Sequence, residues 1–168
     1  YTHKNEEYSV EIKLLDSEKG RELLPTQDEF GKHEFSISGS PLKVGYINLG
    51  NPHAVTFTTK IEQKPLPEWG EKIQNLECFP EGVNFGLAEI LSPTLLNLRV
   101  YERGVGETLS CGSGACAAVV LGNQQNLLKS EVKVNFKKGS LSIKYLKENN
   151  LLTAKGTAEF IEELFIYI

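Results

Sequence analysis

The sequence of 168 residues lacks methionine altogether and has few of the residues that build metal centres or disulfide frameworks. Its three cysteines, Cys78, Cys111 and Cys116, are odd in number and have no repeating spacing. This argues against a disulfide scaffold and favours reduced thiols in the cytoplasm. The histidines are scattered and form no zinc-ligand spacing with the cysteines. Because even a starting methionine is missing, we expect a chain that was processed, truncated or cut from a longer one.

A basic excess and long apolar runs are also lacking. The formal net charge is −4, so we expect no nucleic-acid partner. No apolar stretch approaches the roughly 18 residues of a membrane span. The N-terminal segment is polar and does not have the pattern of a signal peptide. With 40% hydrophobic and 24% charged residues, the composition is that of an ordinary globular domain.

Alternation of apolar and polar residues with a period of two dominates the chain and predicts strands. We expect them over residues 8–14, 42–46, 54–58, 83–91, 95–101, 132–136, 141–145 and 151–154, with one or two more in 158–168. The turn at Lys138-Gly139 predicts a hairpin. Residues 17–32 are the best candidate for a loop or linker.

Only two helices are predicted, over residues 65–74 and 112–123. The second is apolar on nearly all sides, which is typical of a helix enclosed by protein. Many twisted strands and one enclosed helix together predict an α+β fold, with a curled, mainly antiparallel sheet wrapped around one central helix.

The most unusual stretch is YERGVGETLSCGSGACAA, residues 101–118, where Cys111 stands directly before Gly-Ser-Gly at the predicted helix start. The first N–H groups of a helix lack intrahelical partners, and together with the helix dipole they favour negative charge. We therefore expect a lowered pKa for Cys111, and amides at residues 112–114 that bind a carboxylate or phosphate. Such a thiolate is suited to attack a carbonyl, or to take a proton from carbon beside a bound carboxylate.

A structural interpretation of the same stretch stays open, in which the glycines form a tight turn and the cysteines pack in the core. Cys116 lies about 140° further round the helix than Cys111 and is interpreted as core. Cys78 is interpreted as a partly exposed structural thiol. No histidine is near Cys111 in sequence, so a histidine base would have to be one brought close by the fold, such as His53.

Polar residues also stand in tight turns at GNPHAV, with Asn51 and His53, and at FPEGVN, with Asn84. Asparagine often bonds to its own backbone in turns, so each asparagine alone is more typical of a structural role. Glu102 and Arg103 form either a surface pair or a site for an ammonium and a carboxylate, since arginine offers a bidentate fork.

In their order and separations, GNPHAV, FPEGVN and YERGVGETLSCGSGACAA resemble diaminopimelate epimerase, the pyridoxal-independent epimerase of the bacterial lysine and cell-wall pathway. The resemblance runs from about residue 42 to the C-terminus. It implies two similar units, each a curled sheet around a central helix, with the substrate in the cleft between them. It also implies that no cofactor takes part. One thiolate would remove the α-proton, and the other thiol would deliver a proton to the opposite face.

The resemblance further implies roles for particular residues of this sequence. Cys111 would be one of the two thiols, with Glu102 and His53 helping to set its protonation. Gly112 and Ser113 would offer backbone donors to the reacting carboxylate; the serine stands where threonine is common in the family. The substrate-binding set would be Asn51, Asn84, Glu102, Arg103, Gly112 and Ser113.

By the same resemblance, residues 1–15 would cross from a first unit, 16–157 would form the second unit, and 158–168 would return to the first. The first unit, with its own cysteine, is absent from this sequence. We therefore expect half of a cytoplasmic enzyme that interconverts LL- and meso-diaminopimelate in lysine and peptidoglycan precursor biosynthesis, inactive alone, with the first unit as its partner and a homodimer as a candidate assembly. The alternatives are an inactive binding or assembly module of this fold, or a related isomerase with another substrate.

Overall fold

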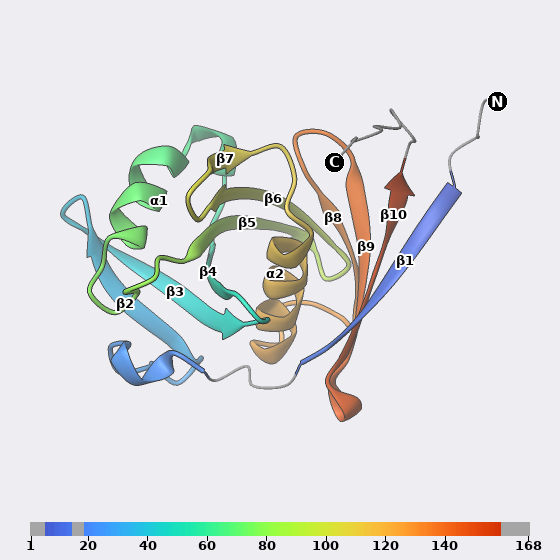
Figure 1. Ribbon diagram of the computed structural model, residues 1–168, viewed down its shortest axis with the longest axis horizontal. Coiled ribbons are helices and arrows are strands. Elements are labelled where there is room, and N and C mark those ends of the chain that lie inside the picture. The colour runs from blue at the N-terminus through green and yellow to red at the C-terminus, as the bar shows by residue number, and fades with distance from the viewer. Residues whose placement is uncertain (1–5, 15–18, 159–168) are drawn as a thin grey trace, which may run out of the picture.

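The computed structural model describes residues 6–14 and 19–158, which form strands, two α-helices and short 3-10 helices (Figure 1). The strands are β1 (Glu6–Lys13), β2 (Lys32–Ile37), β3 (Ser40–Asn48), β4 (Pro52–Phe57), β5 (Asn84–Ser92), β6 (Leu95–Glu102), β7 (Gly106–Thr108), β8 (Glu131–Asn135), β9 (Ser140–Leu146) and β10 (Leu151–Ala158). The helices are α1 (Leu66–Gln74), α2 (Gly112–Gln124), η1 (Arg21–Leu23), η2 (Ile61–Gln63) and η3 (Lys147–Asn149).

All these strands belong to one sheet, in the order β1-β10-β9-β8-β6-β5-β4-β3-β2, with β7 paired to β6 beside that path. Neighbouring strands run antiparallel except in the pairs β4–β5 and β6–β8, which are parallel. The sheet curls around α2 (Figure 1), and this confirms the predicted α+β architecture.

Helix α2 is enclosed by the curl. Every residue from Gly114 to Gly122 is buried, so the middle of the helix has no solvent face. The residues packed around it come from strands along most of the sheet, including Val55, Leu98, Val132, Ile143 and Leu152. The all-round apolar pattern of residues 115–121 therefore matches its surroundings. Cys116 has no exposed surface and is a core residue, as predicted.

Helix α1 packs on the other face of the sheet. Its buried residues Leu66 and Ile73 belong to a second core cluster with Phe85 and other residues of β2–β5. Gly70 lets the helix approach β6 closely, because a Cβ there would lie 2.3 Å from Cγ of Tyr101. This contact lies one residue before Glu102, at the end of β6, and so connects the helix to the candidate site.

Most predicted elements occur with ends shifted by a few residues. The hairpin of β8 and β9 turns at Lys138-Gly139 as predicted, with Gly139 at φ 84°. Two strands were not predicted. In β2 the buried residues His33, Phe35 and Ile37 alternate with less buried ones, which is a strand pattern inside a short polar stretch. Strand β7 has only three residues, too few for a periodic signal.

The predicted loop over residues 17–32 is described from residue 19 onward. It contains η1 and an isolated bridge between Gln27 and His33, and it ends as β2 begins. The strands predicted for 158–168 lie outside the described residues, apart from the last residue of β10.

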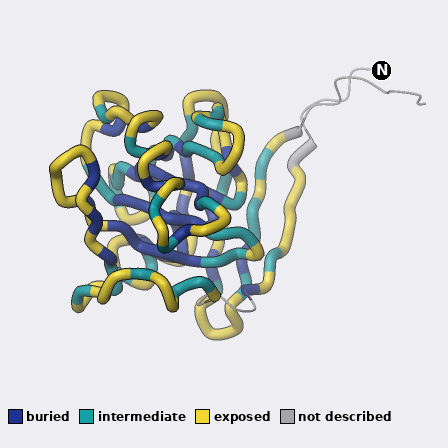
Figure 2. The backbone as a smooth tube through the Cα atoms, turned by 60° about the vertical axis from the view of Figure 1, so that its left-hand side comes forward, coloured by how far each residue is buried: buried dark blue, intermediate teal, exposed yellow. Residues whose placement is uncertain are grey.

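Strands β1 and β10 extend past the body of the sheet as a two-stranded arm (Figures 1 and 2). Their pairing runs from Glu6 opposite Ala158 to Lys13 opposite Leu151. Tyr8 and Val10 on β1 are 52% and 59% exposed. The expected boundaries, with a crossing segment over 1–15, a unit over 16–157 and a returning strand over 158–168, stay predictions. No helix in the described part of the chain has both the length and the apolar character needed to cross a bilayer.

Candidate active site

Cys111 is the N-cap residue of α2, as the sequence predicts, and the first intrahelical bond runs from the Ala115 N–H to its carbonyl at 3.0 Å. The next residues, Gly112 and Ser113, are exposed and half-buried. Among the described residues, nothing accepts a hydrogen bond from either of their backbone N–H groups. Two unpaired donors at the start of a helix form a favourable place for an anion.

The thiol of Cys111 is hydrogen-bonded to a carboxylate. Its Sγ donates to Oε2 of Glu102 at 3.2 Å, and Oγ of Ser113 lies 3.6 Å from the same sulfur. The other carboxylate oxygen, Oε1 of Glu102, accepts from the hydroxyl of Thr108 at 2.6 Å. A thiol, a carboxylate and a hydroxyl thus form one short hydrogen-bonded network at the N-terminus of α2.

The expectation of a lowered pKa for Cys111 is wrong. Burial, which leaves the residue 6% exposed, is the largest cause and raises the pKa of its thiol. Hydrogen bonds from Ser113 and from the Gly114 backbone favour the thiolate, but the bond and the charge of Glu102 oppose it. The helix terminus is present as expected; desolvation and a neighbouring negative charge outweigh it. Cys111 therefore rests as a protonated thiol at neutral pH.

His53 lies at the start of β4 and is 1% exposed. Burial lowers its pKa to about 4, although the negative charge of Glu102 acts in the other direction. The imidazole is therefore neutral at pH 7. Its Nε2 lies 3.1 Å from Oδ1 of Asn51, and because an amide oxygen only accepts, Nε2–H is the donor.

Asn84 connects two strands of the site. It lies opposite His53 in the parallel pair of β4 and β5. Its Nδ2 donates to the carbonyl of Pro52 at 3.2 Å, and its Oδ1 accepts from the backbone N–H of Arg103 at 3.0 Å. These bonds join distant segments and are not the local backbone bonds that asparagine makes in turns, and one Nδ2 hydrogen remains for a ligand.

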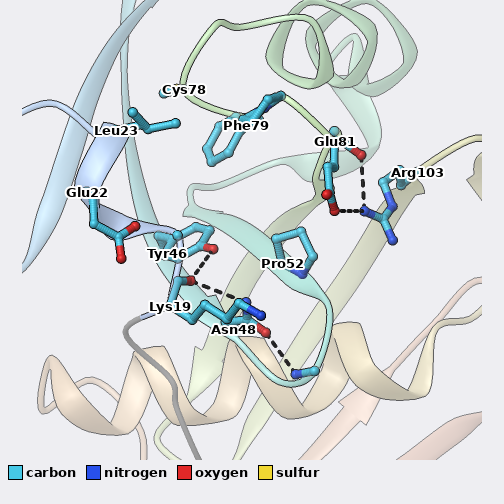
Figure 3. A pocket seen from close by; sticks show the side chains of 14 residues that line it. Lys19, Glu22, Leu23, Tyr46, Asn48, Pro52, Cys78, Phe79, Glu81 and Arg103 are labelled. Atoms are coloured by element: carbon cyan, nitrogen blue, oxygen red, sulfur yellow. Dashed lines mark hydrogen bonds and ion pairs between the residues drawn. The ribbon is translucent and has the colours of Figure 1, made fainter.

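The side chain of Arg103 turns toward the loop after α1 (Figure 3). Its guanidinium donates to the carbonyl of Glu81 at 3.1 Å and lies 3.9 Å from the Glu81 carboxylate. It borders a cavity of about 400 Å³, which Lys19, Glu22, Tyr46, Phe79 and Glu81 also line. Of the predicted site residues, only Arg103 is among the lining residues, so this cavity lies beside the thiol rather than over it.

The topology explains why stretches far apart in sequence meet. Strands β4 and β5 are parallel and pair from His53 and Asn84 onward, whereas β6 is antiparallel to β5 and ends at Glu102. The starts of β4 and β5 and the end of β6 therefore lie at the same end of the strands, beside the start of α2. Thr108 is the one member of the network around the thiol that was not predicted from the sequence. Its contact with Glu102 depends on strand β7, which was not predicted either.

Structures with this arrangement of sheet and helix are known. The chain resembles the structure of a phenazine biosynthesis protein of the PhzF family from Enterococcus faecalis, with a TM-score of 0.53 and 14% identity, covering 93% of this chain and 56% of that one. It also resembles methylitaconate-delta-isomerase, with a TM-score of 0.52 and 12% identity, over 88% of this chain and 52% of the other. At these identities the likeness defines the class of fold.

The sequence comparisons are more specific. The family model of diaminopimelate epimerase matches residues 45–161. The diaminopimelate epimerase of Xylella fastidiosa is 38% identical over 157 residues, or 93% of this chain and 55% of that protein. That of Nitrosomonas europaea is 36% identical over 159 residues, or 95% and 58%. The chain belongs to the diaminopimelate epimerase family, and it spans about half the length of the curated relatives that it matches.

Proposed function

We propose that this chain is the second unit of an epimerase that interconverts LL- and meso-diaminopimelate, and that Cys111 is one of its two proton-transferring thiols. One observation carries the proposal: the thiol of Cys111, bonded to Glu102, stands beside the unpaired backbone amides of Gly112 and Ser113. A proton donor next to an anion site suits transfer to the carbon that bears a carboxylate.

The amides of Gly112 and Ser113 bind the α-carboxylate of the substrate and stabilise the charge that spreads onto it when the α-proton leaves. An amino-acid α-proton is very weakly acidic, so this electrostatic stabilisation, proximity and the exclusion of water must supply catalysis.

The raised pKa of Cys111 makes it the proton donor in the resting state. A thiolate of the first unit takes the α-proton from one face of the carbon, and the Cys111 S–H gives its proton to the opposite face. One thiol and one thiolate enter the step, and one of each leaves it. The sulfur left on Cys111 as thiolate accepts from the Gly114 N–H, and the substrate ammonium, bound at Glu102 and the Arg103 carbonyl, offsets the carboxylate charge.

The remaining residues orient the substrate. Asn51, Asn84 and the Arg103 guanidinium bind its distal amino-acid end, for which Arg103 must leave its exposed contact with Glu81. A distal centre of the wrong configuration would leave buried polar groups such as Asn84 without full pairing, which is the physical source of selectivity. Neutral His53 holds Asn51 by its Nε2–H bond.

The test uses LL-diaminopimelate in heavy water, followed by proton NMR. The chain alone is expected to exchange no α-hydrogen, because it has no second thiol at the site. Addition of a polypeptide that comprises the remaining half of the Nitrosomonas europaea relative is expected to produce exchange and meso product. In that mixture Cys111→Ala is expected to lower the rate by roughly 10²–10⁴-fold.

The matched control is Cys78→Ser, which removes a half-buried thiol outside the network and is expected to leave the rate unchanged. Exchange by the isolated chain would contradict the requirement for a second unit. Assembly of the two polypeptides without exchange of any amino-acid α-hydrogen would instead favour the non-catalytic module, and exchange of a different substrate would favour a related isomerase.

A further inference from the structure

We propose that Thr108 is a positioning residue that holds the carboxylate of Glu102 against the thiol of Cys111. The inference deepens the proposed function and rests on it for its catalytic meaning. The arrangement itself is a property of the thiol and can be measured without substrate.

The hairpin of β6 and β7 brings Thr108 to Glu102. Glu102 pairs with Gly106 and Val100 pairs with Thr108, so Glu102 and Thr108 are diagonal neighbours on one face of the hairpin. Diagonal side chains in an antiparallel pair lie within reach of each other. Thr108 is the last residue of β7, three residues before Cys111, so the same short segment supplies both the hydroxyl and the thiol.

The bond between Thr108 and Glu102 is short and specific. Its length of 2.6 Å lies in the range of O–H···O⁻ bonds, which are about twice as strong as neutral ones. The alternative acceptor, the carbonyl of Ser110, is more distant at 3.3 Å. Because a carboxylate is planar and rigid, a bond that fixes Oε1 also fixes the direction of Oε2, which is the oxygen that meets the thiol.

The other groups around the thiol do not duplicate this role. From α2, Ser113 and the Gly114 N–H contact the sulfur itself, and Cys116 is an uncharged thiol whose pKa is raised to about 11, chiefly by burial. On β4, His53 is neutral, and the charge of Glu102 acts to raise its pKa. Within the described residues, Thr108 is the only side chain bonded to Oε1 of Glu102.

The experiment is a pH titration of isotope-labelled cysteine Cβ by NMR on the full chain, with the Cys111 signal assigned from Cys111→Ala. Since Glu102 raises the pKa of Cys111, release of its carboxylate in Thr108→Val is expected to lower that pKa, in the same direction as Glu102→Gln. Alkylation of Cys111 at a fixed pH below the midpoint is expected to accelerate about threefold, because the thiolate fraction increases. Thr108→Ser keeps the hydroxyl and is expected to restore the original midpoint.

Two controls separate positioning from a general loss of stability. Thr56→Val removes a buried hydroxyl bonded to the Lys43 carbonyl and is expected to leave the Cys111 midpoint unchanged. In the Glu102→Gln background, Thr108→Val is expected to add no further shift, because the two residues act through one carboxylate. The proposal would be overturned if the Cys111 midpoint were unchanged or raised in both Thr108→Val and Thr108→Ala. It would also be overturned if Thr108→Val shifted that midpoint by the same amount in the Glu102→Gln background. None of these readouts depends on epimerase activity.

Discussion

Burial of His53 makes the free energy of unfolding depend on pH. The pKa of this residue is about 4 in the folded chain and 6.5 in the reference state, so between these values the unfolded chain binds a proton that the folded chain does not. The associated stability is fully present above pH 6.5 and is lost as the pH falls toward 4. The loss amounts to about 3 kcal/mol, since each pKa unit corresponds to about 1.4 kcal/mol.

Urea unfolding of the chain at pH 7 and near pH 4.5 measures this dependence. His53→Gln removes the titration and is expected to flatten the profile over that window. His33→Gln is the comparison: burial also lowers the pKa of His33, so this variant removes a separate part of the slope with the same sign. Equal slopes for the original chain and His53→Gln would show that His53 is not held neutral by burial.

Single residues also show where sequence reasoning succeeds and where it cannot. The position of Cys111 at a helix start followed from the local pattern of glycine and small apolar residues, because helix starts depend on a few adjacent residues. The protonation of its thiol depends on burial by distant strands and on Glu102, nine residues earlier. Burial by the folded strands, which the motif does not reveal, decides the sign of the pKa shift.

At the scale of elements, the contact of α1 with β6 is the most restrictive. A Cβ at Gly70 would lie 2.3 Å from Cγ and 2.6 Å from Cβ of Tyr101, and the Cβ cannot move without moving the strand. Gly70→Ala is therefore expected to destabilise the chain. Overpacking costs about 1–3 kcal/mol, and the gain in helix propensity of about 1 kcal/mol offsets only part of it.

Thermal and urea unfolding of Gly70→Ala and Glu71→Ala test the contact. Glu71 is exposed on the same helix, so its alanine variant has no clash and only a small gain in helix propensity, and it is expected to be neutral or slightly stabilised. Tyr101 precedes Glu102, so the clash is also expected to alter the Cys111 titration. A Gly70→Ala variant as stable as Glu71→Ala would mean that the helix can move away from β6 at no cost.

A second prediction at the scale of elements concerns Arg99, which binds β7 through Glu107. Nε and Nη2 of Arg99 donate to the two carboxylate oxygens of Glu107 at 2.8 and 2.9 Å. Nη1 of the same side chain reaches the carbonyls of Ile61 and Lys64 at 2.6 and 3.1 Å. Because Arg99 is only 13% exposed, Glu107→Gln is expected to cost about 1–3 kcal/mol.

The comparison variant is Glu68→Gln, which breaks an exposed i,i+4 pair with Lys72 and is expected to change stability little. Hydrogen exchange of the β7 amides adds a local readout: Glu107→Gln is expected to increase it, and Glu68→Gln is not. If both variants behave alike in unfolding and exchange, the Arg99–Glu107 pair does not hold β7.

Prediction of elements from sequence worked where the signal is local and failed where it is not. The long alternating strands and the enclosed helix were found because each carries its period over many residues. Strand β7 is held by pairing with β6 and by the contact of Arg99 with Glu107. Neither interaction gives the three residues of β7 a periodic sequence pattern. Thr108 was missed for the same reason, although it lies inside the motif that pointed to Cys111.

At the scale of the whole molecule, the arm of β1 and β10 is the surface on which the proposed first unit is expected to assemble, since Tyr8 and Val10 expose large apolar side chains there. Tyr8→Lys combined with Val10→Lys is expected to weaken binding of the complementary polypeptide by at least about tenfold, which corresponds to about 1.4 kcal/mol. Leu91→Lys is the matched control, because Leu91 is 52% exposed near the end of β5, away from the arm. Size-exclusion chromatography with light scattering, and calorimetric titration, measure both.

Equal binding by the arm variant and the control would place the first unit elsewhere, whereas loss of self-association in the arm variant alone would make a second copy of this chain the occupant of the arm.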